Sequence, residues 1–325
     1  FIWMAILSHY MIMMHMKNYT NHSRCFCEEM KLKKLAYKDD INLTDTVVAL
    51  GKFEGLHKGH MLLLHKVLQI SHEEGKESVV VSIDKPETKR ICTIAERDEI
   101  FEKIGIDYNI TCEFNKKFAS IKPETFIMDF VNRLHPSCVI VGKDFRFGKN
   151  RQGDVSLLTS FGDQYGFSVI AYEKLQEDHV VISSSYIRTL LDEGNVSKAD
   201  RFLGRPYSIE GIVQHGKQLG RTIGFPTANL IPQPDKYMVQ NGVYATEVVI
   251  DGTVYKGVTN VGENPTVDTD HKIKVETNVL SLDENLYGKY IKVNFLQQIR
   301  KEMKFDSIQD LKNQIKSDTI EVMHQ

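Results

Sequence analysis

Cysteine is scarce in this chain. The 325 residues include five cysteines, an odd number, and their spacing lacks the density of a secreted disulfide scaffold. A reducing cytoplasm is therefore the expected compartment. His22, Cys25 and Cys27 lie close together, but no second pair follows at zinc-finger spacing, so incidental thiols are favoured over a metal site.

The chain also lacks an excess of either charge. Lys and Arg number 41 and Asp and Glu number 43, which gives a formal net charge of −2, and the two signs are mixed along the sequence. Such a composition produces no bulk attraction to nucleic acid or to an anionic membrane. We therefore expect neither nucleic acid nor a membrane among the partners.

The N-terminus lacks a hydrophobic run long enough to span a bilayer. Its apolar, methionine-rich stretch 1–16 is too short and contains His9 and His15. The stretch also lacks the basic region and the small-residue cleavage site of a signal peptide. An amphipathic anchor is the alternative. We expect residues 1–29 to be an N-terminal extension and leave them out of the fold prediction.

The remaining chain is long enough, with 42% hydrophobic residues, for two domains that each have a core. In its first half, the patterns of buried strands and of amphipathic helices alternate. Strands are predicted at 46–51, 78–83, 138–142 and 166–170, and helices at 61–68, 95–104 and from Pro123. This alternation predicts a parallel, doubly wound, Rossmann-like α/β sheet over residues 30–190. Ligands bind such sheets at the carboxyl ends of the strands.

A glycine turn, residues 51–60, joins the first of these strands to its helix. A strand, a glycine turn and the start of a helix together make a phosphate site at a helix N-terminus. His57 and His60 are three residues apart, so both rings can lie on one side of the first helical turn and meet a triphosphate. On this spacing alone, surface or capping histidines are an equal alternative.

The second half changes to strands without helices between them. They are predicted at 207–213, 242–250, 253–261, 273–282 and 289–295, with Asp251-Gly252 as the clearest hairpin turn. This pattern predicts an antiparallel Greek-key β-barrel over residues 205–325, after a helical junction at 191–204. An amphipathic helix from Phe305 ends the chain, with Asp306 and Gln309 as its predicted capping box.

The loop 220–229 lies between the first two of these strands. Two groups of its residues are suited to a nucleotide: Gly220, Arg221 and Gly224 for phosphates, and Thr227 and Asn229 for a metal. The glycines free backbone N–H groups to face an anion, and the arginine adds a positive fork. The neutral side-chain oxygens are hard ligands that magnesium accepts. No Gly-Lys-Ser/Thr follows, so this is no Walker loop, and an ordinary turn is the alternative.

The runs 204–211 and 220–229 together resemble the riboflavin kinase module, the C-terminal half of bacterial bifunctional riboflavin kinase/FAD synthetases. The resemblance implies ATP binding at the loop glycines and arginine. Lys274-Val-Glu-Thr-Asn278 resembles the strand whose glutamate faces the phosphate loop, so Glu276 is the implied base for the riboflavin 5′-hydroxyl. Arg300 matches a position near the flavin.

The turn 51–60 resembles the ATP-binding motif of the cytidylyltransferase-like superfamily, and specifically the FMN adenylyltransferase module. The implied ATP-binding residues are Gly51, Phe53, Gly55 and Gly59, with Ser184, Ser185 and Arg188 from a run similar to the family's Ser-Ser-Thr-x-Ile-Arg motif. His57 and His60 would stabilise charge as the FMN phosphate attacks the α-phosphorus of ATP. Asp144 and Phe145 lie in a loop that resembles the family's flavin-side loop. A plain serine cap followed by an exposed arginine is the alternative for the second run.

The resemblance covers residues 30 to about 320. It implies a two-domain enzyme that phosphorylates riboflavin to FMN and adenylylates FMN to FAD. ATP is the implied co-substrate and Mg²⁺ the implied cofactor, and we expect a monomer or a weak homo-oligomer.

In the second half, Asn278 stands where the family often has His, which leaves the base itself intact, and in the first half three positions depart from the family pattern. Glu54 stands where Asp is usual, Ser185 replaces Thr, and Asp84-Lys-Pro follows Ile83 where His-Pro is common. The departures leave a kinase-only protein with a degenerate nucleotide-binding or regulatory N-terminal domain as the alternative. A flavin sensor without turnover is a further alternative, which needs neither Glu276 nor the two histidines.

Overall fold

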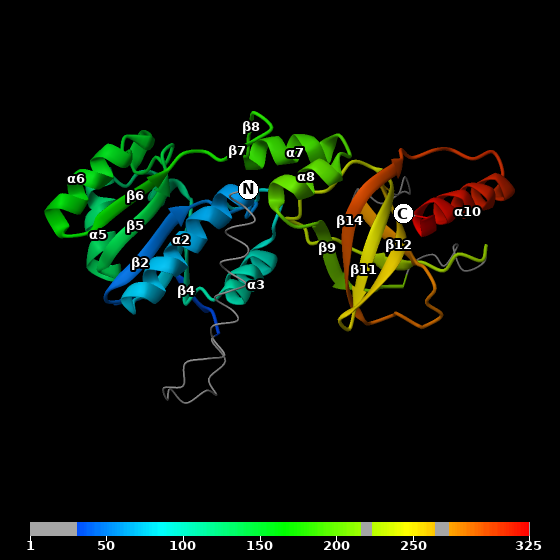
Figure 1. Cartoon of the computed structure of the whole chain (residues 1–325), viewed down its shortest axis with the longest axis horizontal. Helices are drawn as coiled ribbons and strands as arrows, with labels where there is room; N and C mark the ends of the chain where they lie inside the picture. The colour runs from blue at the N-terminus through cyan, green and yellow to red at the C-terminus, as the bar shows by residue number, and fades with distance from the viewer. Residues whose placement is uncertain (1–30, 216–222, 264–272, 325) are drawn as a thin grey trace. The chain divides into compact units, whose positions relative to one another are not determined.

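The computed structural model describes residues 31–215, 223–263 and 273–324 (Figure 1). From Leu32 onward the chain forms one compact unit. The predicted extension 1–29, with its His22, Cys25 and Cys27, lies outside the described residues, as do Gly220 and Arg221.

Six parallel strands form the first sheet. They are β1 (Lys33–Ala36), β2 (Thr46–Gly51), β3 (Glu77–Asp84), β4 (Tyr108–Glu113), β5 (Pro136–Gly142) and β6 (Ser168–Tyr172). Their order is β1-β4-β3-β2-β5-β6, so the direction of winding reverses between β2 and β5. This is the doubly wound topology that the sequence predicts, and its reversal point is where such sheets bind ligands.

Helices cover both faces of this sheet (Figure 1): α2 (Lys58–Glu74) and α3 (Ile94–Ile104) pack on one face, and α5 (Pro123–Leu134) and α6 (Val155–Tyr165) on the other. Residues of β2 point alternately to the two sides, Val47 to the core with α2 and Val48 to the core with α5. A strand covered on both faces needs an apolar residue at almost every position. Two short elements, α4 (Lys116–Ala119) and the 3₁₀ helix η1 (Lys149–Arg151), complete this half.

The junction consists of a small hairpin and two helices. The hairpin is β7 (Gln176–Glu177) with β8 (Val180–Val181), and the helices are α7 (Ser184–Asp192) and α8 (Val196–Leu203). Gly194, with φ of +74°, separates the two helices. Leu190 and Phe202 from these helices share one hydrophobic core with Phe295 of the second sheet.

The second sheet is antiparallel. Its strands are β9 (Tyr207–Ile212), β10 (Ala228–Leu230), β11 (Gly242–Ile250), β12 (Thr253–Glu263), β13 (Ile273–Val279) and β14 (Tyr290–Arg300). They lie in the order β10-β13-β12-β11-β14-β9. The Gln214 N–H donates to the Asn229 carbonyl at 2.9 Å, and this antiparallel bridge joins the two edges into a barrel. Asp251 and Gly252 both have positive φ, as the predicted two-residue hairpin requires.

The C-terminal helix α10 (Ile308–His324) packs against the barrel, where Val322 meets Val243 and Val258. The predicted capping box at Asp306 and Gln309 is wrong by one residue. The Ser307 hydroxyl accepts from the Asp310 N–H at 3.1 Å and donates to the Asp310 carboxylate at 2.6 Å. Ser307 with Asp310 satisfies the same requirement at the helix start, so the pattern alone could not decide between the two registers.

Three strands of the two large sheets escaped prediction, namely β1, β4 and β10, as did the two-residue strands β7 and β8. β1 and β10 have only four and three residues, too few to show alternation. In β4 the polar Asn109 is fully buried, because its side chain bonds Ser82 and Asp98. None of the helices in the described part of the chain is both long enough and apolar enough to cross a membrane.

Candidate active sites

The first candidate site is a cavity of about 320 Å³ at the carboxyl ends of β2 and β5. Residues predicted for ATP and residues predicted for flavin line it together: Gly51, Phe53, His57, Gly59, His60, Asp144 and Phe145. The winding of the sheet reverses between these two strands, which is the position expected for a ligand site.

His57 and His60 stack in this cavity at the start of α2. Their ring centroids are 3.8 Å apart and the ring planes differ by 15°. His57 is the N-cap of α2, and its Nδ1 accepts a hydrogen bond from the His60 backbone N–H at 3.3 Å. The capping alternative is therefore correct for His57, but it occupies only Nδ1. A neutral His57 then carries its proton on Nε2, which remains a donor for a ligand.

Both histidines are neutral at pH 7. Burial, with a smaller contribution from the positive charge of Arg205, lowers the pKa of His57 to about 4. Burial, followed by the effects of His57 and Arg205, lowers the pKa of His60 well below its usual range. In this state the two rings can act on a phosphate as hydrogen-bond donors and not as fixed cations.

The predicted glycines of the turn make room for neighbouring side chains. A Cβ on Gly51 would approach the Phe53 ring to 3.1 Å, and one on Gly59 would approach the His57 ring to 3.2 Å. A Cβ on Gly55 would lie 3.2 Å from the Ser184 hydroxyl. A side chain at any of these positions would thus force its neighbour to shift by a few tenths of an ångström, and direct contact of the glycines with ATP stays a prediction.

On the predicted flavin side, Asp144 and Phe145 line the same cavity from the loop after β5. The Asp144 carboxylate lies 2.9 Å from Lys174 Nζ, and both side chains are more than half exposed, at 62% and 52%. An ion pair this exposed is weak, so Asp144 can exchange its partner for a ligand. Phe145 stacks on Phe147 with ring centroids 5.7 Å apart.

The second predicted ATP run lies beside the cavity. Ser183 lines the cavity and caps α7, whereas Ser184, Ser185 and Arg188 do not belong to its lining. Arg188 donates to the Glu54 carboxylate and to the Lys89 carbonyl, and its guanidinium lies 5.3 Å from the Tyr237 ring centroid. Ser183 is the first serine of that run but was not among the residues predicted for ATP.

Asp84, the departure at the end of β3, does not belong to the cavity lining. Ile83 lines the cavity, while Asp84 is buried and accepts hydrogen bonds from two arginines. Arg90 Nη1 donates at 2.9 Å, and Arg97 donates through Nη1 at 2.7 Å and Nη2 at 2.9 Å. The residue in this unusual position therefore holds the fold together.

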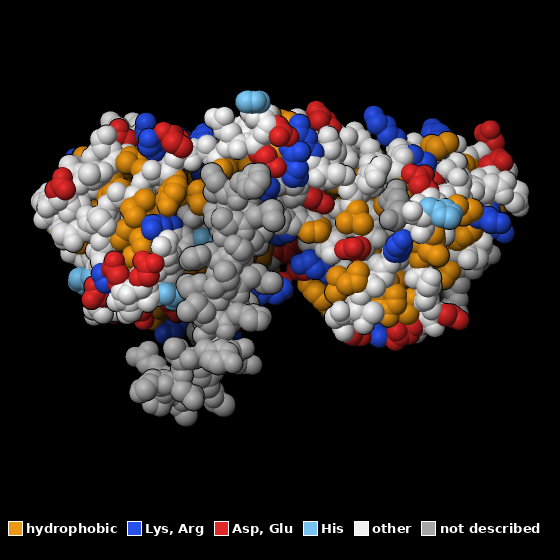
Figure 2. Space-filling model, viewed as in Figure 1, with side chains coloured by type: hydrophobic (Ala, Val, Ile, Leu, Met, Phe, Trp, Pro, Cys, Tyr) orange, Lys and Arg blue, Asp and Glu red, His pale blue; other side chains and the backbone are white. Residues whose placement is uncertain are grey.

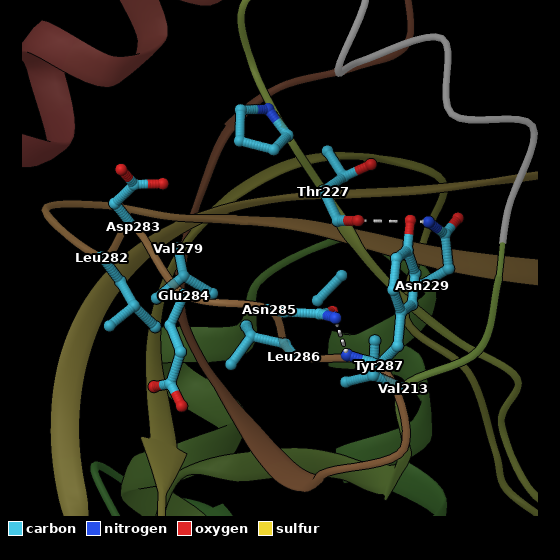
Figure 3. Close-up of a pocket in the computed structure, with 12 residues that line it drawn as sticks. Val213, Thr227, Asn229, Val279, Leu282, Asp283, Glu284, Asn285, Leu286 and Tyr287 are labelled. Carbon is cyan, nitrogen blue, oxygen red and sulfur yellow. Dashed lines mark hydrogen bonds between the residues drawn. The ribbon is translucent and has the colours of Figure 1, made fainter.

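Two cavities in the barrel meet at Thr227. One, of about 300 Å³, is lined by Thr227, Asn229 and the loop 282–287. Figure 3 shows Leu282, Asp283 and Glu284 of this loop on the side opposite Thr227 and Asn229. The other, of about 580 Å³, is lined by Thr227, Glu276 and Arg300. Thr227 therefore forms a wall shared by the cavity that contains Asn229 and the cavity that contains the predicted base.

Asn229 and Glu276 are paired residues on adjacent strands, β10 and β13. The Asn229 side-chain oxygen is buried and accepts no hydrogen bond from any described residue, while its Nδ2 donates to the Thr227 carbonyl at 3.3 Å. Asn278, which stands where the family often has His, donates to the Pro226 carbonyl at 2.7 Å. That bond ties the predicted phosphate loop to the strand that carries the base.

Arg300 is held by Asp318 of α10, a contact that the sequence argument missed. Arg300 Nη2 donates to Asp318 at 2.8 Å and Nε at 3.1 Å, and the Asp318 side chain is only 3% exposed. Asp318 is one of several acidic residues on an amphipathic helix, so nothing local distinguishes it.

In the phosphate loop, Gly224 has φ of +90°, a conformation that favours glycine.

Both halves match known families. Residues 39–186 match the FAD synthetase family model and residues 203–325 the riboflavin kinase family model. The bifunctional riboflavin kinase/FMN adenylyltransferase of Buchnera aphidicola is 34% identical over 289 residues, which cover 85% of this chain and 92% of the relative. The Escherichia coli K12 protein of the same name is 36% identical over 289 residues, covering 84% and 90%.

The whole architecture also has a solved counterpart. A crystal structure described as a macrolide-efflux protein from Streptococcus pneumoniae superposes with a TM-score of 0.81 at 29% identity, covering 90% of this chain and 99% of that one. The likeness extends over both sheets, as do the matches to the curated relatives. This chain therefore belongs to the family of bifunctional riboflavin kinase/FMN adenylyltransferases.

Proposed function

We propose that this chain phosphorylates riboflavin to FMN and adenylylates FMN to FAD, with ATP as the co-substrate of both reactions. The observation that carries the proposal is the separation of two sets of site residues. One set surrounds the cavity at the reversal of the parallel sheet, and the other surrounds the two barrel cavities that meet at Thr227. Each set lies in the half that matches the corresponding family.

In the kinase half, Glu276 is the proposed base. The riboflavin 5′-hydroxyl oxygen attacks the γ-phosphorus of ATP, the bond to the bridging oxygen breaks, and ADP leaves. Glu276 accepts the hydroxyl proton. The cavity with Glu276 and Arg300 would hold the flavin, and the neighbouring cavity with Asn229 would hold the nucleotide. Thr227 lines both, so it is suited to the position where phosphate is transferred.

Asn229 and Thr227 are the proposed magnesium ligands. The buried Asn229 Oδ1 accepts no hydrogen bond from the described part of the chain, so an oxygen that magnesium favours is available there. When bound, the ion would neutralise charge on the ATP phosphates. The remaining ATP contacts in this half are proposed for Gly220, Arg221 and Gly224.

In the adenylyltransferase half, a phosphate oxygen of FMN attacks the α-phosphorus of ATP, and pyrophosphate leaves as the bond to the bridging oxygen breaks. We assign His57 and His60 to charge stabilisation through N–H donors. His57 offers Nε2, because its Nδ1 already accepts the His60 N–H. No covalent enzyme intermediate is needed. Asp144 and Phe145 are assigned to FMN.

The kinase-only alternative is not favoured. Similarity to the bifunctional relatives extends through both halves, and each half matches its own family. The three departures do not remove a cavity-lining side chain: Glu54 pairs with Arg188, Asp84 pairs with buried arginines, and Ser185 keeps a hydroxyl.

We place the protein in the cytoplasm, where ATP is abundant. Cys92, Cys112 and Cys138 are buried free thiols, which supports a reducing compartment. On the face shown in Figure 2, acidic and basic side chains are interspersed, in keeping with the expectation that nucleic acid is no partner. The expected monomer or weak homo-oligomer stays a prediction.

A chromatographic time course tests this function. Purified protein is incubated with riboflavin, ATP and magnesium, and products are separated over time. FMN that appears first and FAD that follows are the expected result. FMN that accumulates without FAD, even when FMN is supplied directly, would contradict the adenylyltransferase assignment.

A further inference from the structure

Arg205 connects the kinase half to the nucleotide turn of the first half. It belongs to the stretch 203–325 that matches the riboflavin kinase family, directly after α8. Its Nη1 donates to the Leu56 carbonyl at 2.6 Å and its Nη2 to the Gly55 carbonyl at 2.9 Å. These two consecutive carbonyls directly precede His57, so one planar guanidinium holds both with its two parallel donors.

The turn that Arg205 holds is strained. Phe53 and Leu56 have φ of +39° and +43°, and both side chains are fully buried. A non-glycine residue rarely adopts this region and persists there only where its surroundings hold it. The Cys92 N–H donates to the Glu54 carbonyl at 3.1 Å from one side, and Arg205 holds the next two carbonyls from the other.

Arg205 is itself held in place. Gly204, with φ of +77°, ends α8 in a left-handed conformation. Two residues beyond Arg205, the Tyr207 N–H donates to the Asp200 carboxylate at 2.6 Å, and the Tyr207 ring is buried in the barrel core. The chain on both sides of Arg205 is therefore anchored, so its side chain reaches the turn from a fixed base.

We infer that Arg205 is a positioning residue for adenylyl transfer, supplied by the kinase half. By holding the Gly55 and Leu56 carbonyls, it sets the backbone that carries His57 and hence the stacked pair of rings at the start of α2. Misplacement of such groups by about 1 Å can cost roughly a hundredfold in rate. The inference rests on the proposed adenylyltransferase activity, and it means that the two halves are not catalytically independent.

The test compares Arg205→Gln and Arg205→Lys with the wild type in the full-length protein, using FMN and ATP as substrates for FAD formation. We expect Arg205→Gln to lower kcat for FAD formation by about 10- to 100-fold, with a smaller change in KM for ATP. Arg205→Lys should recover part of this loss, because an ammonium group can still donate to one carbonyl. FMN formation from riboflavin should stay within about twofold of the wild type in both variants.

Arg133→Gln is the matched control. Arg133 lies in α5, on the opposite face of the first sheet from α2, and its side chain is 29% exposed and donates to Asp129 and to the Tyr37 and Asp39 carbonyls. Its variant should keep both activities. FAD formation in Arg205→Gln within twofold of the wild type would overturn the inference, and so would equal loss of FMN and FAD formation in both Arg205 variants, which would indicate general damage to the fold. A wild-type protein that makes no FAD would overturn the proposed function and this inference with it.

Discussion

Asn229 lies directly opposite Glu276 across the antiparallel pair of β10 and β13. Residues opposite one another in such a pair project from the same face of the sheet, with their Cβ atoms about 5 Å apart. The proposed metal ligand and the proposed base are thus neighbours, although a loop and two strands separate them in the sequence. This arrangement suits a reaction in which a hydroxyl loses a proton while it attacks a metal-bound phosphate.

Glu276→Gln should abolish most of the kinase activity. The amide keeps the size of the side chain but cannot accept the proton, so FMN formation should fall by about 10²- to 10⁴-fold. FAD formation from supplied FMN should remain near the wild-type rate. Glu247→Gln, on strand β11, which β12 separates from the strand of Glu276, is the control and should leave both rates unchanged. FMN formation at a near wild-type rate in Glu276→Gln would remove Glu276 from the mechanism.

Asn229→Ala should raise the magnesium concentration needed for kinase activity. The variant removes the buried oxygen that is available for the ion. In a magnesium titration of FMN formation, the magnesium concentration that gives half-maximal activity should be about tenfold higher, or more, than in the wild type. Asn313→Ala, at an exposed position of α10 outside this cavity, should leave the metal requirement unaltered. A titration identical to that of the wild type would rule out Asn229 as a ligand.

His57 should make the protein less stable in acid. Its pKa is about 4 in the folded chain and 6.5 ordinarily, so the unfolded chain binds the proton more tightly. The free energy of unfolding should therefore fall as the pH drops from about 6.5 to about 4, by about 3 kcal/mol for this residue. Above pH 6.5 the residue is neutral in both states and contributes no pH dependence.

Urea unfolding of His57→Asn at several pH values measures this contribution. Asparagine can still cap α2, so the variant removes the titration and keeps the cap. Its curve of unfolding free energy against pH should be flatter between pH 6.5 and 4. The exposed His72 provides a control, since His72→Asn should run parallel to the wild type. If the curve for His57→Asn instead runs parallel to that of the wild type, the pKa of His57 is not depressed.

Asp84→Asn should be strongly destabilising. Asp84 neutralises Arg90 and Arg97, whose side chains are 8% and 1% exposed, and loss of its charge leaves them buried without a full partner. Removing one member of a buried ion pair typically costs about 3–5 kcal/mol. Urea unfolding at neutral pH measures the change. Asp163→Asn, on the exposed face of α6, should stay within about 0.5 kcal/mol of the wild type. A similarly small loss for Asp84→Asn would show that the arginines find other partners.

The sequence by itself determined the class of both halves. Alternation of apolar strands and helices predicted the doubly wound sheet, and strands separated by tight turns predicted the antiparallel barrel. Both patterns are local, because the side chains of a strand or a helix report burial at a fixed period. The Asp251-Gly252 hairpin was also readable, since it depends on backbone conformations that few residue types adopt. The glycine turn before α2 was readable from its motif, but its positive φ angles fall on Phe53 and Leu56, which the pattern did not indicate.

Only the tertiary structure decided which residues meet. It placed Glu276 opposite Asn229, Asp318 on Arg300, two arginines on Asp84 and Arg205 on the Gly55 and Leu56 carbonyls. A periodic pattern shows that a side chain is buried, but it does not name the partner that satisfies its charge or hydrogen bonds. That partner comes from another element, which the packing of the whole chain brings close, so the local sequence does not identify it.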